Sequence, residues 1–109
     1  MGFFDMFGAR DAFDRVNDDN HPRHQVTHEL IAGAAGFEAM RMWEHHRENE
    51  GYTEHHELAK ELLAGFVTAE VEKHFERGHY NHLNREEAQL QAQRQAEHLY
   101  DQQYGQQRY

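Results

Sequence analysis

Apolar residues recur at helical spacing through the middle of the chain. In the segment 24–50 an apolar stripe advances in alternating steps of four and three residues, through Val26, Leu30, Gly33, Phe37 and Met40. The segment 54–77 continues the same pattern with Leu58, Leu62, Gly65, Phe66 and Ala69. Such a stripe is typical of an amphipathic helix that buries one face. The pattern therefore predicts two long helices, over 24–50 and 54–77.

The two predicted helices resemble each other in sequence. Aligned at an offset of 32 residues, the segments 24–44 and 56–76 each contain an apolar block, 30–37 or 62–69, bracketed by glutamates. The identical pairs are His24/His56, Glu29/Glu61, Leu30/Leu62, Ala32/Ala64, Gly33/Gly65, Glu38/Glu70 and Glu44/Glu76. Two copies are too few for a solenoid. We interpret the match as a duplication that forms a pseudo-symmetric, antiparallel helix pair.

A glycine lies in the middle of each predicted helix, at the matched positions Gly33 and Gly65. Each glycine costs about 0.5–1 kcal/mol relative to alanine there, so both need a structural reason. We expect the two helices to cross with Gly33 near Gly65, because missing side chains let two backbones approach. The alternative interpretation is a gap that holds a small ligand. The same crossing would bring acidic residues together in two pairs, Glu29 with Glu70 and Glu61 with Glu38. The interpretation we favour for these four glutamates is that they flank the apolar stripe, partly exposed, and pair with Arg41, Lys73 or a nearby histidine.

Capping residues mark the ends of these helices. Thr27 suits the N-cap of the first long helix, and Gly78 suits the position just after the second. Before them, a Phe-rich N-terminal segment over 1–22 is expected to contain a short helix over 9–16.

A last helix is expected over 84–104. Asn84 and Glu87 form a capping-box-like pair at its start. Its inner face carries mostly small side chains, which allow a close approach to a neighbour: Ala88, Ala92, Ala96 and Leu99. The whole chain, 1–109, is thus predicted to be a single all-α domain, a small helical bundle.

Composition narrows the function. The chain of 109 residues has no cysteine, which excludes disulfides, zinc–thiolate sites and thiol catalysis, and it has no serine nucleophile. The formal net charge of −9 disfavours nucleic-acid binding. Apolar stretches are far shorter than the roughly 20 residues that span a bilayer. We therefore expect a soluble, cytoplasmic, non-enzymatic protein without a cofactor, without nucleic acid and without a membrane.

Histidine is the unusual component, with eleven residues. His24 and His28 have the i, i+4 spacing of a helical metal site, and His79 and His82 lie three residues apart. The chain contains no His-Glu-x-x-His motif. These four residues are weak candidate metal ligands, and a histidine-based metal- or pH-responsive protein is an alternative function.

Phenylalanine is concentrated before the first long helix, at Phe3, Phe4, Phe7 and Phe13. Large exposed apolar patches are rare on monomers, and a closed dimer is the commonest way to cover them. We expect a homodimer whose interface includes Phe3, Phe4 and Phe7. A small-molecule pocket in the bundle is the alternative.

Three stretches carry a family resemblance. The start of the chain over 1–5, the block 27–35 (Thr-His-Glu-Leu-Ile-Ala-Gly-Ala-Ala) and the block 60–65 (Lys-Glu-Leu-Leu-Ala-Gly) resemble the CipC-like antibiotic-response proteins. These are small, mostly fungal proteins that carry a domain of unknown function. The resemblance implies an intracellular protein linked to antibiotic or stress response, with no established reaction, and it transfers no catalytic residue. Together with the composition, it predicts a non-enzymatic protein that acts through a protein interface.

Overall fold

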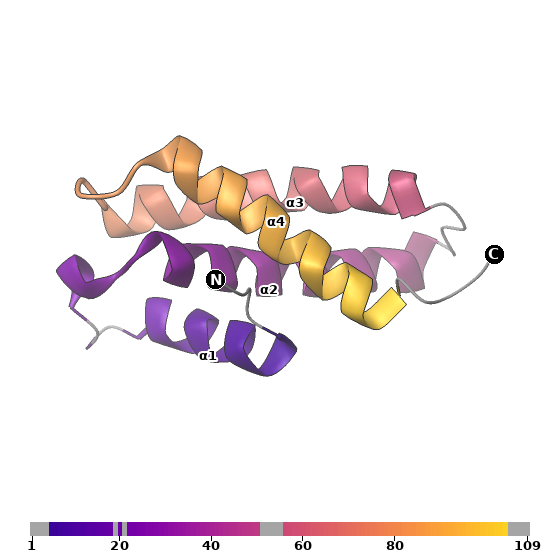
Figure 1. The fold of residues 1–109 in the computed structure, drawn as a ribbon, viewed down its shortest axis with the longest axis horizontal. Coiled ribbons are helices and arrows are strands. Elements are labelled where there is room, and N and C mark those ends of the chain that lie inside the picture. Colours follow the sequence, from indigo (N-terminus) through magenta and orange to yellow (C-terminus); the bar gives the residue numbers. More distant parts are fainter. Residues whose placement is uncertain (1–4, 19, 21, 51–55, 105–109) are drawn as a thin grey trace.

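The computed structural model describes residues 5–18, 20, 22–50 and 56–104 (Figure 1). These residues form α1 (Met6–Val16), a 3₁₀ turn η1 (Arg23–Gln25), α2 (His28–Glu50), α3 (His56–Gly78) and α4 (Arg85–Tyr104). Within the described part there is no strand, so the prediction of an all-α bundle is confirmed.

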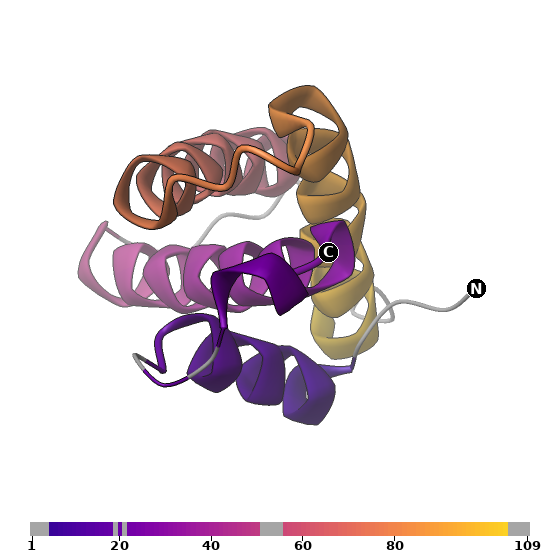
Figure 2. The same cartoon turned by 90° about the vertical axis from the view of Figure 1, so that its left-hand side faces the viewer.

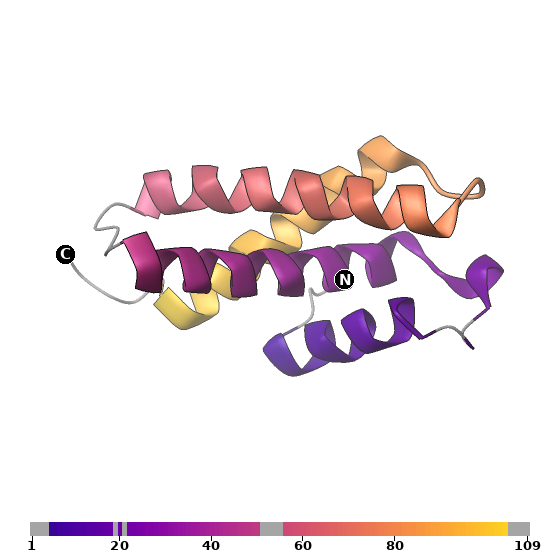
Figure 3. The ribbon, with the colours of Figure 1, turned by 180° about the vertical axis from the view of Figure 1, so that it is seen from behind.

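The central element is α2. Figure 2 shows α2 with α1 below it, α3 above it and α4 along one side. Helix α3 runs antiparallel to α2, and α4 crosses both of them diagonally (Figures 1 and 3). On the face opposite α4, the C-terminal half of α2 extends beyond the short α1 (Figure 3). Helix α2 is therefore enclosed on three sides, whereas each of the other helices keeps a broad exposed face.

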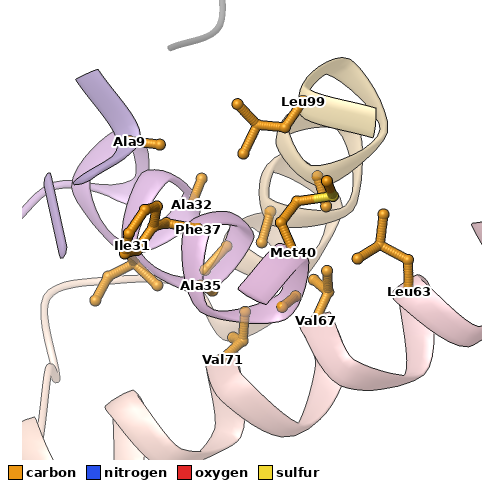
Figure 4. Close-up of a cluster of buried hydrophobic side chains, with 14 of the residues drawn as sticks. Ala9, Ile31, Ala32, Ala35, Phe37, Met40, Leu63, Val67, Val71 and Leu99 are labelled. Carbon is orange, nitrogen blue, oxygen red and sulfur yellow. The ribbon is translucent and has the colours of Figure 1, made fainter. Parts of the chain in front are cut away.

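The core lies where the other three helices face α2. Figure 4 shows side chains from each helix converging there, with Met40 of α2 between Leu63 and Val67 of α3 and Leu99 of α4. Many core positions are alanines, which explains how the helices approach closely. The buried alanines are Ala9, Ala12, Ala32, Ala34, Ala35, Ala39, Ala59, Ala88, Ala92 and Ala96. The prediction of a small-sided inner face on α4 is confirmed, because Ala88, Ala92, Ala96 and Leu99 are all buried.

Side-chain caps start three of the helices. Helix α1 begins three residues earlier than expected, because the Asp5 carboxylate accepts a hydrogen bond from the Gly8 amide at 2.8 Å. Thr27 caps α2 as predicted, with its hydroxyl accepting from the Leu30 amide at 3.1 Å. Asn84 caps α4 as predicted, and its side chain accepts from the Glu87 amide at 3.0 Å.

The end of α3 differs from the prediction. Gly78 is the last residue of the helix rather than the residue after it, and the left-handed conformation falls on His79 (φ 51°). Glycine is needed at position 78 for space, because a Cβ there would overlap the ring of Tyr80. The chain folds Tyr80 back over the helix end, and this contact selects glycine one residue earlier than a standard αL cap would.

The predicted crossing of Gly33 with Gly65 is wrong. Gly65 is exposed, and a Cβ built on it meets nothing within 4 Å. Glu38 of α2 contacts Lys73 and His74 of α3, and these contacts fix the register of the antiparallel pair. Gly33 lies five residues before Glu38 and therefore lies opposite the part of α3 beyond His74, whereas Gly65 lies nine residues before His74, so the two glycines cannot meet. The same register rules out the predicted pairs of Glu29 with Glu70 and Glu61 with Glu38.

The close backbone approach occurs instead between α2 and α4, at Gly36. A Cβ on Gly36 would lie 2.8 Å from Cγ of Gln95 and 3.4 Å from the backbone nitrogen of Ala96. Gln95 is itself 1% exposed and cannot move aside into solvent. The close approach of α2 is therefore made to α4 at Gly36, and not to α3 at Gly33.

Candidate functional site

A cluster of charged side chains connects α2 to α3. We call Glu38, Glu70, Lys73, His74 and Arg77 the Glu38 cluster. Glu38 of α2 is its centre: one carboxylate oxygen lies 2.6 Å from Nε2 of His74, and the other accepts a hydrogen bond from Lys73 at 3.0 Å. The His74 side chain is 1% exposed and that of Glu38 is 14% exposed. The cluster is thus a largely buried polar contact between two helices that otherwise meet through apolar residues.

The two carboxyl groups of the cluster differ in electrostatics. Burial alone would raise the pKa of Glu38, but hydrogen bonds from His74 and Lys73 outweigh it and lower the pKa to about 2. Glu70 shows the opposite balance: burial raises its pKa despite the hydrogen bond from Lys73, and the neighbouring Glu38 raises it further. One oxygen of Glu70 accepts from Lys73 at 3.3 Å, and the other lies 3.1 Å away without hydrogen-bond alignment. Glu38 is held as the anion, whereas Glu70 is the acid of the pair that protonates first.

Arg77 extends the cluster to the first helix. Its guanidinium donates to Nδ1 of His74 at 3.3 Å and to the side-chain oxygen of Asn17, the residue that ends α1. Because Nδ1 of His74 accepts from Arg77, Nε2 carries the ring proton and donates it to Glu38. Both ring nitrogens are therefore engaged, and the cluster joins α1, α2 and α3.

A groove opens beside this cluster, on the surface of α1 and α2. We call it the α1–α2 groove. Its volume is about 310 Å³, and it is lined by Phe13 of α1 and by four residues of α2: Glu38, Arg41, Met42 and His45. The four α2 residues follow helical spacing and form one stripe along the helix. Glu38 thus belongs to both features, with its carboxylate bound in the cluster and its side chain at the edge of the groove.

The arrangement of the Glu38 cluster suits a structural role better than a catalytic one. The ring nitrogens of His74 and the carboxylate oxygens of Glu38 are all hydrogen-bonded within the protein. A general base or a nucleophile needs a free position within reach of a substrate. The arrangement can transmit a change in protonation between helices, but it presents no activated group to solvent.

The predicted metal ligands lie apart. His24 belongs to the 3₁₀ turn and His28 is the first residue of α2, so the two do not share one helical face. His79 follows α3 in the left-handed conformation, and His82 lies in the turn before α4. Among residues 5–18, 20, 22–50 and 56–104, no group of three potential metal ligands comes together.

Two of these histidines hold the α3–α4 corner against the start of α2. Nε2 of His28 accepts a hydrogen bond from the Asn84 amide at 2.9 Å. Nε2 of His82 donates to the carbonyl of Val26, also at 2.9 Å. One ring of each predicted pair, His28 and His82, therefore has a backbone hydrogen-bond partner in this structure.

The predicted interface residues are only partly described. Phe3 and Phe4 lie outside the described residues. Phe7 is on the outer side of α1 and is 87% exposed, which is the highest exposure among the large apolar side chains of the described part. Met42 and Leu90 follow, with 40% and 43%.

The sequence predicts part of the Glu38 cluster. Glu38 and Glu70 occupy matched positions beside the apolar blocks, and the expectation that they pair with Lys73 or a nearby histidine is confirmed by the contacts of Glu38 with Lys73 and His74. The meeting of Glu38 and Glu70 in one cluster and the link to α1 through Arg77 were not predicted. Equal distances from the five-residue connection would place Glu38 opposite residue 68, so the length of the connection alone does not give the observed register.

The fold and the site define a small all-α domain with a central helix and a buried charged contact. The chain belongs to the family described as virulence factor CipC-like, a domain of unknown function, whose family model matches residues 12–103. The match confirms the resemblance seen in the sequence. Comparisons with curated proteins and with solved structures gave no match. None of the helices in the described part has the length and apolarity that crossing a membrane requires.

Proposed function

We propose that this protein is a non-enzymatic, cytoplasmic member of the CipC-like family that acts in stress or antibiotic response through a protein interface, and that it forms a homodimer. The interface is the outer face of α1, centred on Phe7. The observation that carries the proposal is the exposure of Phe7, which is 87% accessible although it is a large apolar residue. The resemblance to antibiotic-response proteins supports the biological setting.

The surroundings of Phe7 suit a symmetric contact. Phe7 lines a shallow surface groove together with Gly8, Arg10, Asp11 and Asp14. In a two-fold interface each surface meets its own copy, so a face with both signs of charge around an apolar centre is self-complementary. Arg10 of one copy can then pair with Asp14 of the other while the two Phe7 rings stack. A buried aromatic with a polar rim is also the usual anatomy of an interface hot spot.

The absence of enzymatic activity is supported by the chemistry of the Glu38 cluster. Its histidine and its most acidic carboxylate already use their hydrogen-bonding positions within the protein. The chain also lacks the cysteine and serine nucleophiles of the commonest hydrolases. An interface needs neither, because it depends on shape and on apolar area.

Size-exclusion chromatography with light scattering tests the proposal. The wild-type protein is expected to elute at about twice the chain mass of 13.0 kDa. Phe7→Ser should shift the mass to that of one chain, whereas Leu90→Ser, which changes an exposed apolar residue on α4, should leave the dimer intact. A wild-type mass of one chain at all concentrations, or an unchanged mass for Phe7→Ser, would contradict the dimer.

A further inference from the structure

A small cation-bearing groove lies on the surface of α1 and α2, beside the Glu38 cluster and away from the face that Phe7 occupies. Its volume of about 310 Å³ falls at the lower end of the range for small-molecule sites. The residues around Phe7 line a separate groove that shares none of its lining. A ligand here would therefore be independent of the proposed dimer.

Two of the five residues that line the α1–α2 groove, Phe13 and Met42, give it an apolar part, and this part is partly fixed in place. Phe13 packs on Phe37 with ring centres 5.3 Å apart, so its ring is held against α2 and does not need to be ordered by a ligand. Met42 is 40% exposed and supplies a flexible apolar surface that adapts to different shapes. An occupant is thus expected to have an apolar body.

Arg41 supplies the recognition group. Its guanidinium carbon lies 5.6 Å from the centre of the Phe37 ring, which orients the side chain along the groove. Within the described part of the chain, no carboxylate lies within ion-pair distance of Arg41. Its hydrogen-bond donors thus remain available to an anionic ligand, and a guanidinium binds a carboxylate through two parallel hydrogen bonds.

Glu38 explains why Arg41 is available. Glu38 is one helical turn from Arg41, yet its two carboxylate oxygens are used by His74 and Lys73. Lys73 also remains half exposed next to the groove and balances the charge of Glu38. A ligand carboxylate that enters the groove therefore meets the Arg41 guanidinium, which has no intramolecular carboxylate partner. The negative charge of Glu38 beside it is already neutralised.

We propose that the α1–α2 groove binds a small monocarboxylic acid with an apolar body, with its carboxylate on Arg41 and its body between Phe13 and Met42. A single negative charge fits better than a phosphate dianion, since the groove offers one cation and the formal net charge of −9 opposes a second negative charge. Octanoate, a monocarboxylic acid with an apolar body, is the probe we choose.

The proposal is tested by titrating octanoate, below its micelle concentration, into ¹⁵N-labelled protein and following backbone NMR shifts. Shift changes should centre on Phe13, Arg41, Met42 and His45. Arg41→Gln should weaken binding about tenfold, because a hydrogen bond to a charged group is lost. Arg94→Gln, an exposed arginine on α4, should leave the affinity unchanged.

Two further measurements keep the result decisive. 1-Octanol, which has the same apolar body and no charge, should bind at least tenfold more weakly than octanoate. Met42→Glu places a negative charge at an exposed position of the groove and should also abolish octanoate binding while the fold is retained. Equal affinities for octanoate and octanol, unchanged binding by Arg41→Gln, or shifts confined to other surfaces would each overturn the proposal. Phe7→Ser should bind octanoate normally whether or not the dimer exists.

Discussion

The two matched segments of this chain have the same sequence pattern and very different environments. In α2 the whole block 31–37 is buried, whereas in the matching part of α3 only Leu63 and Val67 are buried and Gly65 and Ala69 are exposed. The difference follows from position, because α2 has neighbours on three sides, whereas α3 packs mainly on α2 and α4. A repeated pattern therefore predicts repeated helices, but it does not predict equal burial.

Matched residues consequently have different roles. Trp43 is 2% exposed and packs edge-to-face on Tyr100 of α4, while its counterpart Phe75 packs on Tyr80, which follows its own helix. Glu38 and Glu70 meet in one cluster instead of two symmetric ones, and their pKa values move in opposite directions. The pseudo-symmetry of the sequence is thus lost at the level of packing. Substitutions at matched positions test how far this asymmetry extends.

The largest contrast is expected at the matched glycines. Gly33→Leu inserts a large side chain at a buried position and should destabilise the fold by about 3 kcal/mol through overpacking. Gly65→Leu meets open space and should stabilise the protein by about 0.5–1 kcal/mol, because leucine has the higher helix propensity. Urea denaturation of both variants measures the contrast. Equal destabilisation by the two substitutions would mean that the helices cross at the glycines after all.

The matched glutamates should give the second contrast. Glu38→Gln removes the anion that His74 and Lys73 bind and should cost about 2 kcal/mol of unfolding free energy at pH 7. Glu70→Gln should cost less than about 1 kcal/mol, because burial already disfavours its charged form. If the two variants melt alike, the distinction between the two acids is wrong.

The pH dependence of Glu38 provides an internal check. Folding lowers the pKa of this carboxyl from its ordinary value of 4.5 to about 2, so its contribution is present above pH 4.5 and is lost as the pH falls toward 2. The advantage of the wild type over Glu38→Gln should therefore shrink between pH 7 and pH 3. An advantage that stays constant over this range would show that the carboxylate is not the stabilising form.

The elements of the fold were predictable where local chemistry decides them. Thr27 and Asn84 cap helices as their side chains and the following residues indicate, and the alanines of α4 face the core as their spacing predicts. The choice of partner was not predictable from these signals. Gly33 and Gly65 look equivalent in sequence, and only the register of α2 against α3, in which Glu38 lies beside His74, shows that they cannot meet. Gly78 was placed one residue wrong, because its role depends on the ring of Tyr80 rather than on the helix end.

The third contrast concerns the starts of the two long helices. His28 of α2 accepts a hydrogen bond from the Asn84 amide at the start of α4. His28→Ala removes this acceptor and should cost about 1 kcal/mol of unfolding free energy. His28→Gln, which keeps a side-chain acceptor, should cost less. Urea denaturation of both variants measures the difference, and equal costs would assign the effect of His28→Ala to lost packing rather than to the hydrogen bond.

The smallest effect is expected at Lys60, which occupies the position in α3 that matches His28 in α2. Lys60 pairs with Asp101 at 3.0 Å and lies 5.8 Å from the centre of the Tyr100 ring, so it fastens the other end of α4. The pair is partly exposed, and such ion pairs contribute about 0.2–1 kcal/mol. Lys60→Gln should therefore cost about 0.5 kcal/mol at low salt and almost nothing at 1 M salt, where the charges are screened. Denaturation at the two salt concentrations measures this, with Arg94→Gln as a control for general charge effects.

The matched residues His28 and Lys60 would then attach opposite ends of α4 by different chemistry. His28 acts through a neutral acceptor that salt does not affect, and Lys60 acts through an ion pair that salt screens. A cost for Lys60→Gln that does not depend on salt would instead assign its effect to packing of the lysine stem on Tyr100.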